Sequence, residues 1–282
     1  MDKNKQQTID FGLYLVSTPI GNMEDITYRA LNILKKSDII LCEDTRRSGK
    51  LLFYYKIKSK VMPYHKFNEK KMSNRVIDSI KNNKVVSLIS DAGTPTISDP
   101  GAILVNRCIS ENLNVYPIPG PSAVTAAVSV SGFSDQYLFY GFLPKKDQEL
   151  ENVFKSLNNL NYAIIFFIPA LKINFYISKF KEYFLDRRIM IAKEMTKIYE
   201  KFIRTEVELM KDFPENLKGE LTVVLSQKIK ENKARKEITE AAKIEIKKML
   251  KKYSHKDVVD FISKKENISK KIIYDFCLKF KK

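Results

Sequence analysis

Apolar residues in the first 230 positions gather in short runs, and stretches with helical spacing separate these runs. The runs are Leu13–Thr18, Asp38–Cys42, Val85–Asp91, Asn114–Ile118, Tyr137–Leu143, Tyr162–Ile168, Arg188–Lys193 and Leu221–Ser226. Several of them are apolar throughout rather than alternating, which is typical of strands covered on both faces. Between runs, Asp25–Lys36 and Asn74–Lys81 carry apolar residues on one helical face. This alternation predicts an α/β protein with parallel strand pairings.

The chain changes character twice. Two prolines flank a glycine at Ile118-Pro119-Gly120-Pro121, and we place the boundary between two α/β domains there, as residues 12–119 and 120–228. After Ser226 the pattern of strands stops, and residues 228–252 are rich in Lys, Glu and Ala, which predicts a helix. Residues 229–282 are therefore expected to form a small helical appendage.

Two more helices are expected at the end of this appendage. Ser254-His255-Lys256-Asp257 has the form of a capping box that opens a helix over Lys256–Lys265, with Val258, Val259 and Ile262 inward. Ser269 is placed to cap a last helix, whose inward residues would be Ile272, Ile273, Phe276 and Phe280. The short connection between them predicts a unit like a helix-turn-helix.

Charge narrows the class of partner. The 282 residues include 50 Lys and Arg against 33 Asp and Glu, so the net charge is +17. Such a balance favours a polyanionic partner, with nucleic acid first. Only nine of the basic residues are Arg, and abundant Lys, Asn and Ile also fit a genome drifted towards A and T. The distribution of charge along the chain says more about a partner than the total does. Residues 228–282 alone hold 18 basic and 8 acidic residues.

The sequence does not support a secreted, a membrane-spanning or a metal-binding protein. The first seven residues are polar and no apolar core follows them, unlike a signal peptide. The longest apolar run, Tyr162 to Leu171, is ten residues and too short to span a bilayer. Cys42, Cys108 and Cys277 lie far apart without the spacing of metal ligands. We expect a cytoplasmic protein that has no disulfide, no metal and no membrane partner.

Candidate chemistry lies in four loops, each of which follows an expected strand, where open α/β sheets bind ligands. The loops are Ser17–Asn22, Glu43–Arg47, Ser90–Gly101 and Pro117–Ala123. The first could be a plain strand-to-helix turn, and it lacks the glycine patterns of nucleotide-phosphate loops. The third holds two each of Gly, Pro, Asp, Ser and Thr, which suits a small-molecule ligand better than a core element.

The second loop places two carboxylates and two guanidinium groups at a strand end. A carboxylate there could take a proton from a hydroxyl, and arginines pair with phosphate oxygens. The alternative is a simple helix start, in which Asp44 or Thr45 is the cap and Arg47 lies on the surface.

Taken together, the motifs resemble one family. They are Thr18-Pro19-Ile20-Gly21-Asn22, Glu43-Asp44-Thr45-Arg46, Tyr64-His65-Lys66-Phe67-Asn68-Glu69, Ser90-Asp91-Ala92-Gly93-Thr94-Pro95, Pro119-Gly120-Pro121-Ser122 and Gly141-Phe142-Leu143-Pro144. From about Leu13 to Ser226 the chain resembles the bacterial ribosomal RNA small subunit methyltransferase I family, in the tetrapyrrole-methylase-like superfamily. The C-terminal helices resemble the family's small appended domain.

The resemblance implies two α/β domains with S-adenosylmethionine in the cleft between them, and a homodimer. It implies 2'-O-methylation of a cytidine ribose in the decoding region of 16S ribosomal RNA, free or in the small ribosomal subunit. By motif position, the cofactor-binding residues would be Pro19, Asp91, Ala92, Gly93, Thr94, Ser122, Phe167 and Leu221.

Methyl transfer from a sulfonium needs little more than positioning and removal of the hydroxyl proton. Asp44 is our first candidate for the acid–base or orienting group, and Glu43 is the second. The expected RNA-binding residues are Arg46, Arg47, His65, Asn68 and Lys145. His65 could instead be a merely solvated loop residue.

One segment departs from the family. Where the family usually has a Glu-Ser-Pro-His-Arg-like sequence, this chain reads Ile168-Pro169-Ala170-Leu171-Lys172, and Tyr199 stands where His is common. Two alternative functions therefore stay open. One is a methylase of the same superfamily that acts on a tetrapyrrole or a protein. The other is a non-catalytic RNA-binding or ribosome-assembly factor on this fold.

Overall fold

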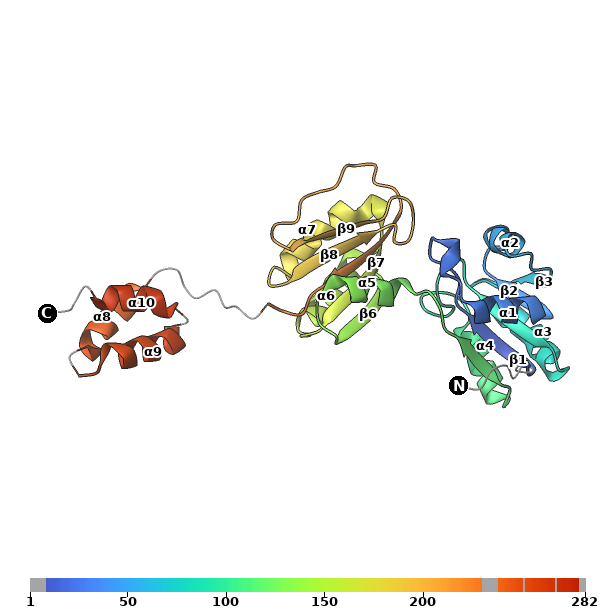
Figure 1. The fold of residues 1–282 in the computed structure, drawn as a ribbon, viewed down its shortest axis with the longest axis horizontal. Coiled ribbons are helices and arrows are strands. Elements are labelled where there is room, and N and C mark those ends of the chain that lie inside the picture. The colour runs from blue at the N-terminus through green and yellow to red at the C-terminus, as the bar shows by residue number, and fades with distance from the viewer. Residues whose placement is uncertain (1–8, 230–237, 251, 267, 279–282) are drawn as a thin grey trace. The chain divides into compact units, whose positions relative to one another are not determined.

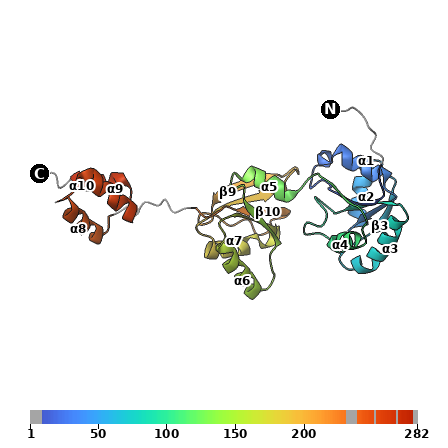
Figure 2. The ribbon, with the colours of Figure 1, turned by 90° about the horizontal axis from the view of Figure 1, so that it is seen from below.

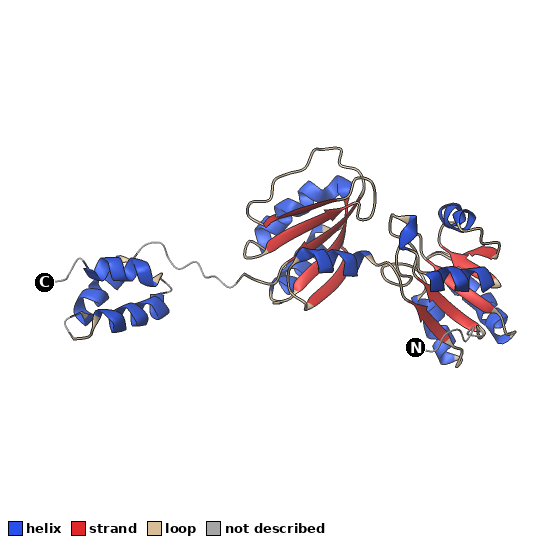
Figure 3. Ribbon diagram, viewed as in Figure 1, coloured by secondary structure: helices blue, strands red, loops and turns tan. Residues whose placement is uncertain are grey.

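A computed structural model describes residues 9–229, 238–250, 252–266 and 268–278. The chain divides into two compact units, Met1–Gln227 and Lys228–Lys282. The first unit contains two five-stranded sheets, and the described part of the second is built from helices (Figures 1 and 3). These features confirm the α/β class with a helical C-terminal part. The domain boundary at residues 119 and 120 stays a prediction.

The first sheet is parallel throughout, in the order β3-β2-β4-β1-β5. Its strands are β1 (Gly12–Val16), β2 (Ile39–Cys42), β3 (Lys60–Pro63), β4 (Val85–Ile89) and β5 (Val115–Ile118). Because all five run the same way, their carboxyl ends meet at one edge, and the loops after β1, β2, β4 and β5 gather there. These are the four loops with candidate chemistry.

Helices cover both faces of this sheet (Figure 2). They are α1 (Tyr28–Lys36), α2 (Thr45–Tyr54), α3 (Glu69–Lys81) and α4 (Ala102–Ser110), with a short 3-10 turn, η1 (Met23–Asp25), before α1. Apolar residues of α1 and α2 pack on one face with Val16 and Ile40, and those of α3 and α4 pack on the other with Leu13 and Leu41. Burial on both faces explains why these strands are apolar throughout.

The second sheet has the order β6-β7-β10-β8-β9. Its strands are β6 (Tyr137–Phe142), β7 (Ala163–Pro169), β8 (Arg188–Lys193), β9 (Lys201–Glu206) and β10 (Glu220–Leu225). Only β6 and β7 pair in parallel, and the other three pairings are antiparallel. The expectation of parallel pairing is wrong here, because the seven-residue loop between β8 and β9 is too short for a crossover and forces a hairpin.

This sheet is also covered on both faces. Helices α6 (Asp147–Asn158) and α7 (Ile173–Tyr183) pack on one face, and α5 (Ala123–Ser131) packs on the other (Figure 2). A short 3-10 turn, η2 (Ala170–Lys172), joins β7 to α7. The small residues of α5 let it lie close to Ile165 and Val224. The strand β9 was missed by the sequence pattern, since its residues are mostly exposed or half-buried and polar.

The second unit contains α8 (Glu240–Met249), α9 (His255–Glu266) and α10 (Lys270–Leu278) around a small apolar core. Val258, Val259 and Ile262 are buried, and the Ser254 hydroxyl accepts from the Asp257 amide at 3.2 Å, as the capping box predicts. Ile273 is buried and Ile272 and Phe276 are partly buried. Phe280 and residues 230–237 of the expected first helix lie outside the described residues.

In the part of the chain that the structure describes, no helix is long and apolar enough to cross a membrane. Cys42, Cys108 and Cys277 are buried free thiols.

Candidate active site

A cavity of about 460 Å³ lies where the loops of the first sheet meet strands and loops of the second. The first-sheet side contributes Ile20, Glu43, Arg47 and residues 91–94 and 97–99. The second-sheet side contributes the first turn of α5 with its cap Ser122, and Phe142, Phe167, Ile168, Pro169, Met195 and residues 219–222. Ligand sites are usually concave, mostly apolar and about 300–1,000 Å³ in volume, so this cavity has the form of a small-molecule site.

Hydrogen bonds tie the loops of the first sheet to one another. Thr18 and Gly93 form a two-way backbone bridge, with N···O distances of 2.9 and 3.0 Å. The hydroxyls of Ser17 and Thr94 are 3.0 Å apart, and the Thr94 hydroxyl donates to the Pro121 carbonyl at 3.2 Å. Gly93 has a φ of +81°, a left-handed conformation that favours glycine. The loops after β1, β4 and β5 therefore hold one another in place.

Strained backbone lies on both sides of the cavity. Thr96 and Ser98 have φ values of 71° and 66° in the loop after β4. Glu194 and Thr196 have φ values of 50° and 64° in the loop after β8. Non-glycine residues adopt positive φ uncommonly, and such strain concentrates at sites where the surrounding structure fixes a functional geometry.

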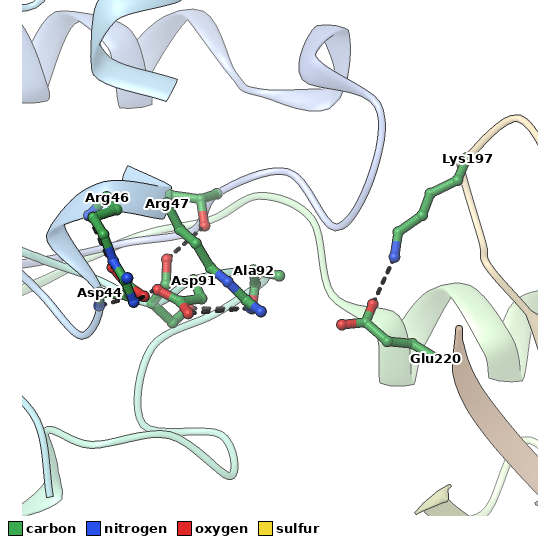
Figure 4. Close-up of polar contacts among 9 residues, drawn as sticks. Asp44, Arg46, Arg47, Asp91, Ala92, Lys197 and Glu220 are labelled. Atoms are coloured by element: carbon green, nitrogen blue, oxygen red, sulfur yellow. Dashed lines mark hydrogen bonds and ion pairs between the residues drawn. The ribbon is translucent and has the colours of Figure 1, made fainter. Parts of the chain in front are cut away.

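Direct contacts join the two sides. The Asn22 amide donates to the Thr196 hydroxyl at 3.0 Å. A Cβ on Gly21 would lie 2.5 Å from Cγ of Lys197 and 2.9 Å from the Met195 carbonyl, so only glycine lets this loop approach so closely. The Lys197 ammonium donates to Glu220 at 2.8 Å, on the second-sheet side of the site (Figure 4).

The cavity is acidic although the chain is strongly basic. Its charged lining residues are four carboxylates, Glu43, Asp91, Asp99 and Glu220, and one guanidinium, Arg47. Arg47 donates to Asp91 at 3.3 Å, and the two side chains point toward each other (Figure 4). An excess of negative charge in a small cavity favours a cationic ligand such as a sulfonium.

Glu43 and Asp44 are neighbours in different environments. Asp44 caps α2: it accepts from the Arg46 amide at 2.9 Å and pairs with the Arg46 guanidinium at 2.9 Å. The hydrogen bonds from the Arg46 side chain and amide lower the pKa of Asp44 to about 2. Glu43 lines the cavity, and its burial, followed by the charge of Asp91, raises its pKa. Glu43 is therefore much the better proton acceptor of the two.

Asp99 is a further perturbed carboxyl in the cavity lining. Burial, and then the charge of Glu43, raises the pKa of Asp99 to about 6. The group can gain or lose a proton near neutral pH, which is the property that acid–base chemistry requires. Its position in the sequence, within the polar loop Ser90–Gly101, was the available signal.

The lining fits S-adenosylmethionine in three respects. Phe142, Phe167 and Met195 offer apolar surface for a purine ring. The carboxylates offer negative charge to a sulfonium. Ser122 caps α5 without a side-chain hydrogen bond, and the first turn of α5 lines the cavity, so amides at a helix N-terminus are available to a carboxylate.

The structure brings most of the expected cofactor residues together. Seven of them line the cavity: Asp91, Ala92, Gly93, Thr94, Ser122, Phe167 and Leu221. Pro19 lines a smaller adjoining cavity of about 230 Å³, which shares Arg47 and Asp91 with the first. The departing segment contributes Ile168 and Pro169 to the wall, whereas Leu171 is 75% exposed. Tyr199 is also largely exposed.

The expected RNA-binding residues are less concentrated. Arg46 is exposed beside Asp44, and Arg47 lines both cavities. His65 is half-buried, and its amide donates to Asn68 Oδ1 at 2.9 Å, so Asn68 also shapes the turn after β3. Lys145 is exposed just beyond β6.

Sequence reasoning missed several residues of the site. Ile97, Ser98, Asp99, Phe142 and Met195 line the cavity but were not among the expected site residues. Phe67 was also missed as a candidate contact: its side chain is 95% exposed, and its ring meets His65 edge-on with centroids 6.1 Å apart. Within the described residues, no group of three or more His, Cys, Asp or Glu is arranged to hold a metal ion.

Comparison with known proteins assigns the chain and its fold to a family. The sequence pattern of the Tetrapyrrole (Corrin/Porphyrin) Methylases matches residues 12–210, and the chain belongs to that family. A solved structure titled uroporphyrin-III C-methyl transferase from Thermus thermophilus complexed with S-adenyl homocysteine superposes with a TM-score of 0.53. That superposition covers 76% of this chain and 97% of that one at 13% identity, which shows the shared fold alone.

Sequence relatives narrow the family. Ribosomal RNA small subunit methyltransferase I of Thermotoga maritima is 43% identical over 77% of this chain and 98% of its own length. The same enzyme of Neisseria meningitidis serogroup A is 33% identical over 100% of this chain and 98% of its own length. Within the tetrapyrrole methylases, the chain therefore belongs to the ribosomal RNA small subunit methyltransferase I family. It is an S-adenosylmethionine-dependent methyltransferase.

Proposed function

We propose that this chain methylates the 2'-hydroxyl of a cytidine ribose in the decoding region of 16S ribosomal RNA. The observation that carries the proposal is the acidic cavity, in which Glu43 and Asp91 line the same space as the apolar Phe167 and Leu221. S-adenosylmethionine, when bound there, supplies a methyl group activated on a sulfonium. We propose Pro19, Asp91, Ala92, Gly93, Thr94, Ser122, Phe167 and Leu221 as its binding residues.

The residues of the chain have two tasks in such a reaction. The first is to hold the ribose oxygen in line with the methyl carbon, and this positioning supplies most of the rate enhancement. The second is to accept the hydroxyl proton as the new bond forms, for which Glu43 is the candidate because its carboxyl lines the cavity. Asp44 has the orienting role, since it fixes the start of α2 and the side chain of Arg46.

An RNA-binding surface lies next to the cavity. The ends of β2 and β3 are neighbours in the sheet, so the segment with Arg46 and Arg47 lies beside the loop with His65 and Asn68. Arginines suit phosphate oxygens, and the exposed ring of Phe67 suits stacking with an unpaired base. We include Lys145 on this surface because it lies three residues beyond β6, whose Phe142 lines the cavity.

We further propose the domains 12–119, 120–228 and 229–282, a homodimer, and a cytoplasmic location where ribosomal subunits are found. Large exposed apolar side chains in the first unit are consistent with a second copy of the chain. Examples are Tyr28, Phe53, Leu171 and Ile198.

The test is to incubate the purified chain and methyl-labelled S-adenosylmethionine with unmethylated small ribosomal subunits and with their free RNA. Label at one ribose 2'-oxygen, mapped by nuclease digestion and mass spectrometry, is the expected result. Label on a protein or a tetrapyrrole, with none on RNA, would move the chain to another acceptor in its superfamily. Absence of both label and cofactor binding would indicate a non-catalytic RNA-binding factor.

The second unit is proposed to add RNA affinity, because residues 228–282 carry 18 basic against 8 acidic residues. Deleting Ser254–Lys282 should weaken RNA binding and flatten its dependence on salt, and it should leave the affinity for S-adenosylmethionine unchanged. Fluorescence titrations of RNA at several salt concentrations measure both quantities. An unchanged affinity and salt slope would contradict this role.

A further inference from the structure

The cavity contains a second carboxyl whose state depends on Glu43. Asp99 follows the strained residues Thr96 and Ser98 in the loop after β4, and it lines the same cavity as Glu43. Within the described residues neither carboxylate forms a salt bridge, although Arg47 lines the same cavity. Two like charges that face one cavity disfavour full ionisation of both, so one of them takes up a proton at a higher pH than it would alone.

We propose that Glu43 and Asp99 act as one proton-sharing pair that accepts the ribose 2'-hydroxyl proton, with Asp99 as a further catalytic residue. This inference rests on the proposed RNA reaction. The two groups come from adjacent strand ends, Glu43 after β2 and Asp99 from the loop after β4, and β2 and β4 are hydrogen-bonded neighbours.

The proposed methyl transfer to the ribose oxygen balances in atoms and in charge. The ribose O2' forms a bond to the methyl carbon while the carbon–sulfur bond breaks, and its electron pair stays on sulfur as a neutral thioether. The O2' proton passes to a carboxylate oxygen of the pair, which changes from two negative charges to one. The donor thus loses its positive charge as the pair loses one negative charge, so the net charge of the cavity and its ligands is unchanged.

The surroundings explain why the pair titrates near neutral pH. Burial and the charge of Glu43 raise the pKa of Asp99 to about 6, and burial and the charge of Asp91 raise that of Glu43. Arg47 from α2 and His65 from the loop after β3 act in the opposite direction on Glu43. On the second-sheet side, the carboxylate of Glu220 is paired with Lys197 at 2.8 Å. Above pH 6 the Asp99 carboxyl is therefore largely ionised and ready to accept a proton.

The experiment compares the wild-type chain with Asp99→Asn on unmethylated small-subunit RNA across pH 5 to 9. The expected fall in kcat is about 100-fold, the lower range for loss of a general base. The wild-type rate should fall on the acid side near pH 6, where the pair takes up a proton. In Asp99→Asn this acid limb should move to lower pH, because Asp99, whose pKa of about 6 sets the limb, no longer titrates.

Two controls keep the result interpretable. Calorimetric titration should give both chains the same dissociation constant for S-adenosylmethionine within about threefold, well below the tenfold change that 1.4 kcal/mol would produce. Asp78→Asn, an exposed carboxyl on α3, is the matched substitution and should leave kcat and the acid limb unchanged.

The outcomes separate this inference from the proposed function. An active wild-type chain with an equally active Asp99→Asn variant, or with an unmoved acid limb, overturns the pair alone. Loss of donor binding in Asp99→Asn also overturns it, because Asp99 would then be a cofactor-binding residue. A wild-type chain that does not methylate RNA overturns the proposed function, and the pair as an acceptor of a ribose proton falls with it.

Discussion

The two sides of the cavity differ in chemical character. The first-sheet side supplies Glu43, Arg47, Asp91 and Asp99, which are charged, and the second-sheet side supplies Phe142, Phe167 and other apolar residues. Glu220 is the charged exception on the second side, and it is paired with Lys197. The topology explains the difference, because a parallel sheet gathers its polar loops at one edge, whereas the mixed second sheet presents buried strand residues. We expect proton acceptance to belong to the first side, whereas the second side adds apolar surface for the donor to the donor-binding loops of the first.

The largest effect is expected from Glu43→Gln on the first-sheet side. Loss of the proton acceptor should lower kcat by about 10²–10³-fold, and the dissociation constant of S-adenosylmethionine should stay the same. Steady-state rates on small-subunit RNA and calorimetry measure the two quantities. Glu208→Gln, at an exposed position after β9, is the matched control. A variant that loses donor binding instead would break the division between the two sides.

On the second-sheet side, Phe167→Ala should act on binding. Removing the ring takes away apolar contact surface, and we expect the dissociation constant of S-adenosylmethionine to rise about tenfold with little change in kcat. Phe175→Ala, on α7 and outside the cavity lining, should change neither. A fall in kcat at saturating donor would contradict the assignment of this wall to binding.

Gly21→Ala tests how the two sides are held together. The new Cβ would lie 2.5 Å from Lys197 Cγ and 2.6 Å from Thr196 Oγ1, so the two loops must move apart. We expect donor binding to weaken by about threefold to tenfold, consistent with the cost of overpacking. Gly49→Ala is the control, because no atom lies within 4 Å of its Cβ and alanine favours the helix. Equal behaviour of both variants would contradict the close approach.

The smallest expected effect is that of Asp99→Asn on the melting temperature of the chain. Asp99 has a pKa of about 6 in the folded chain against 3.8 for the free group, so the folded state binds more protons between these pH values. The stability contributed by this group therefore decreases as the pH rises from about 4 to 6. Asp99→Asn should raise the melting temperature by about 2–4 °C at pH 8 and leave it unchanged at pH 4. An equal shift at both pH values would show that burial of the charge is not the cause.

The sequence predicted strand direction better in the first sheet than in the second, and it missed one strand in each, β3 and β9. Runs such as Val85–Asp91 are apolar throughout because helices cover both faces, and the structure has β4 at Val85–Ile89. The strand β9 escaped notice because its polar residues show no burial pattern. Strand direction in the second sheet depended on the short loop between β8 and β9, which the apolar pattern does not report.

In the candidate site, too, the sequence predicted what local composition reveals and missed what depends on tertiary contacts. Residues in glycine- and proline-rich loops, such as Asp91 and Thr94, could be singled out because their composition is unlike that of core elements. The sequence analysis placed Asp44 ahead of Glu43, but the sequence does not report the contact with Arg46 or the cavity lining that distinguish the two residues. Phe142 lies in one of the motifs that carry the resemblance, but its place in the cavity, like that of Met195 from the loop after β8, depends on the folding of distant segments.

The division between the two sides is tested most directly by kcat/KM for S-adenosylmethionine in the double variant Glu43→Gln, Phe167→Ala. If one residue acts on the reaction and the other on donor binding, the two single effects multiply, and kcat/KM falls by about 10³-fold or more. A double variant no worse than Glu43→Gln alone would contradict the account, because both residues would then serve the same step.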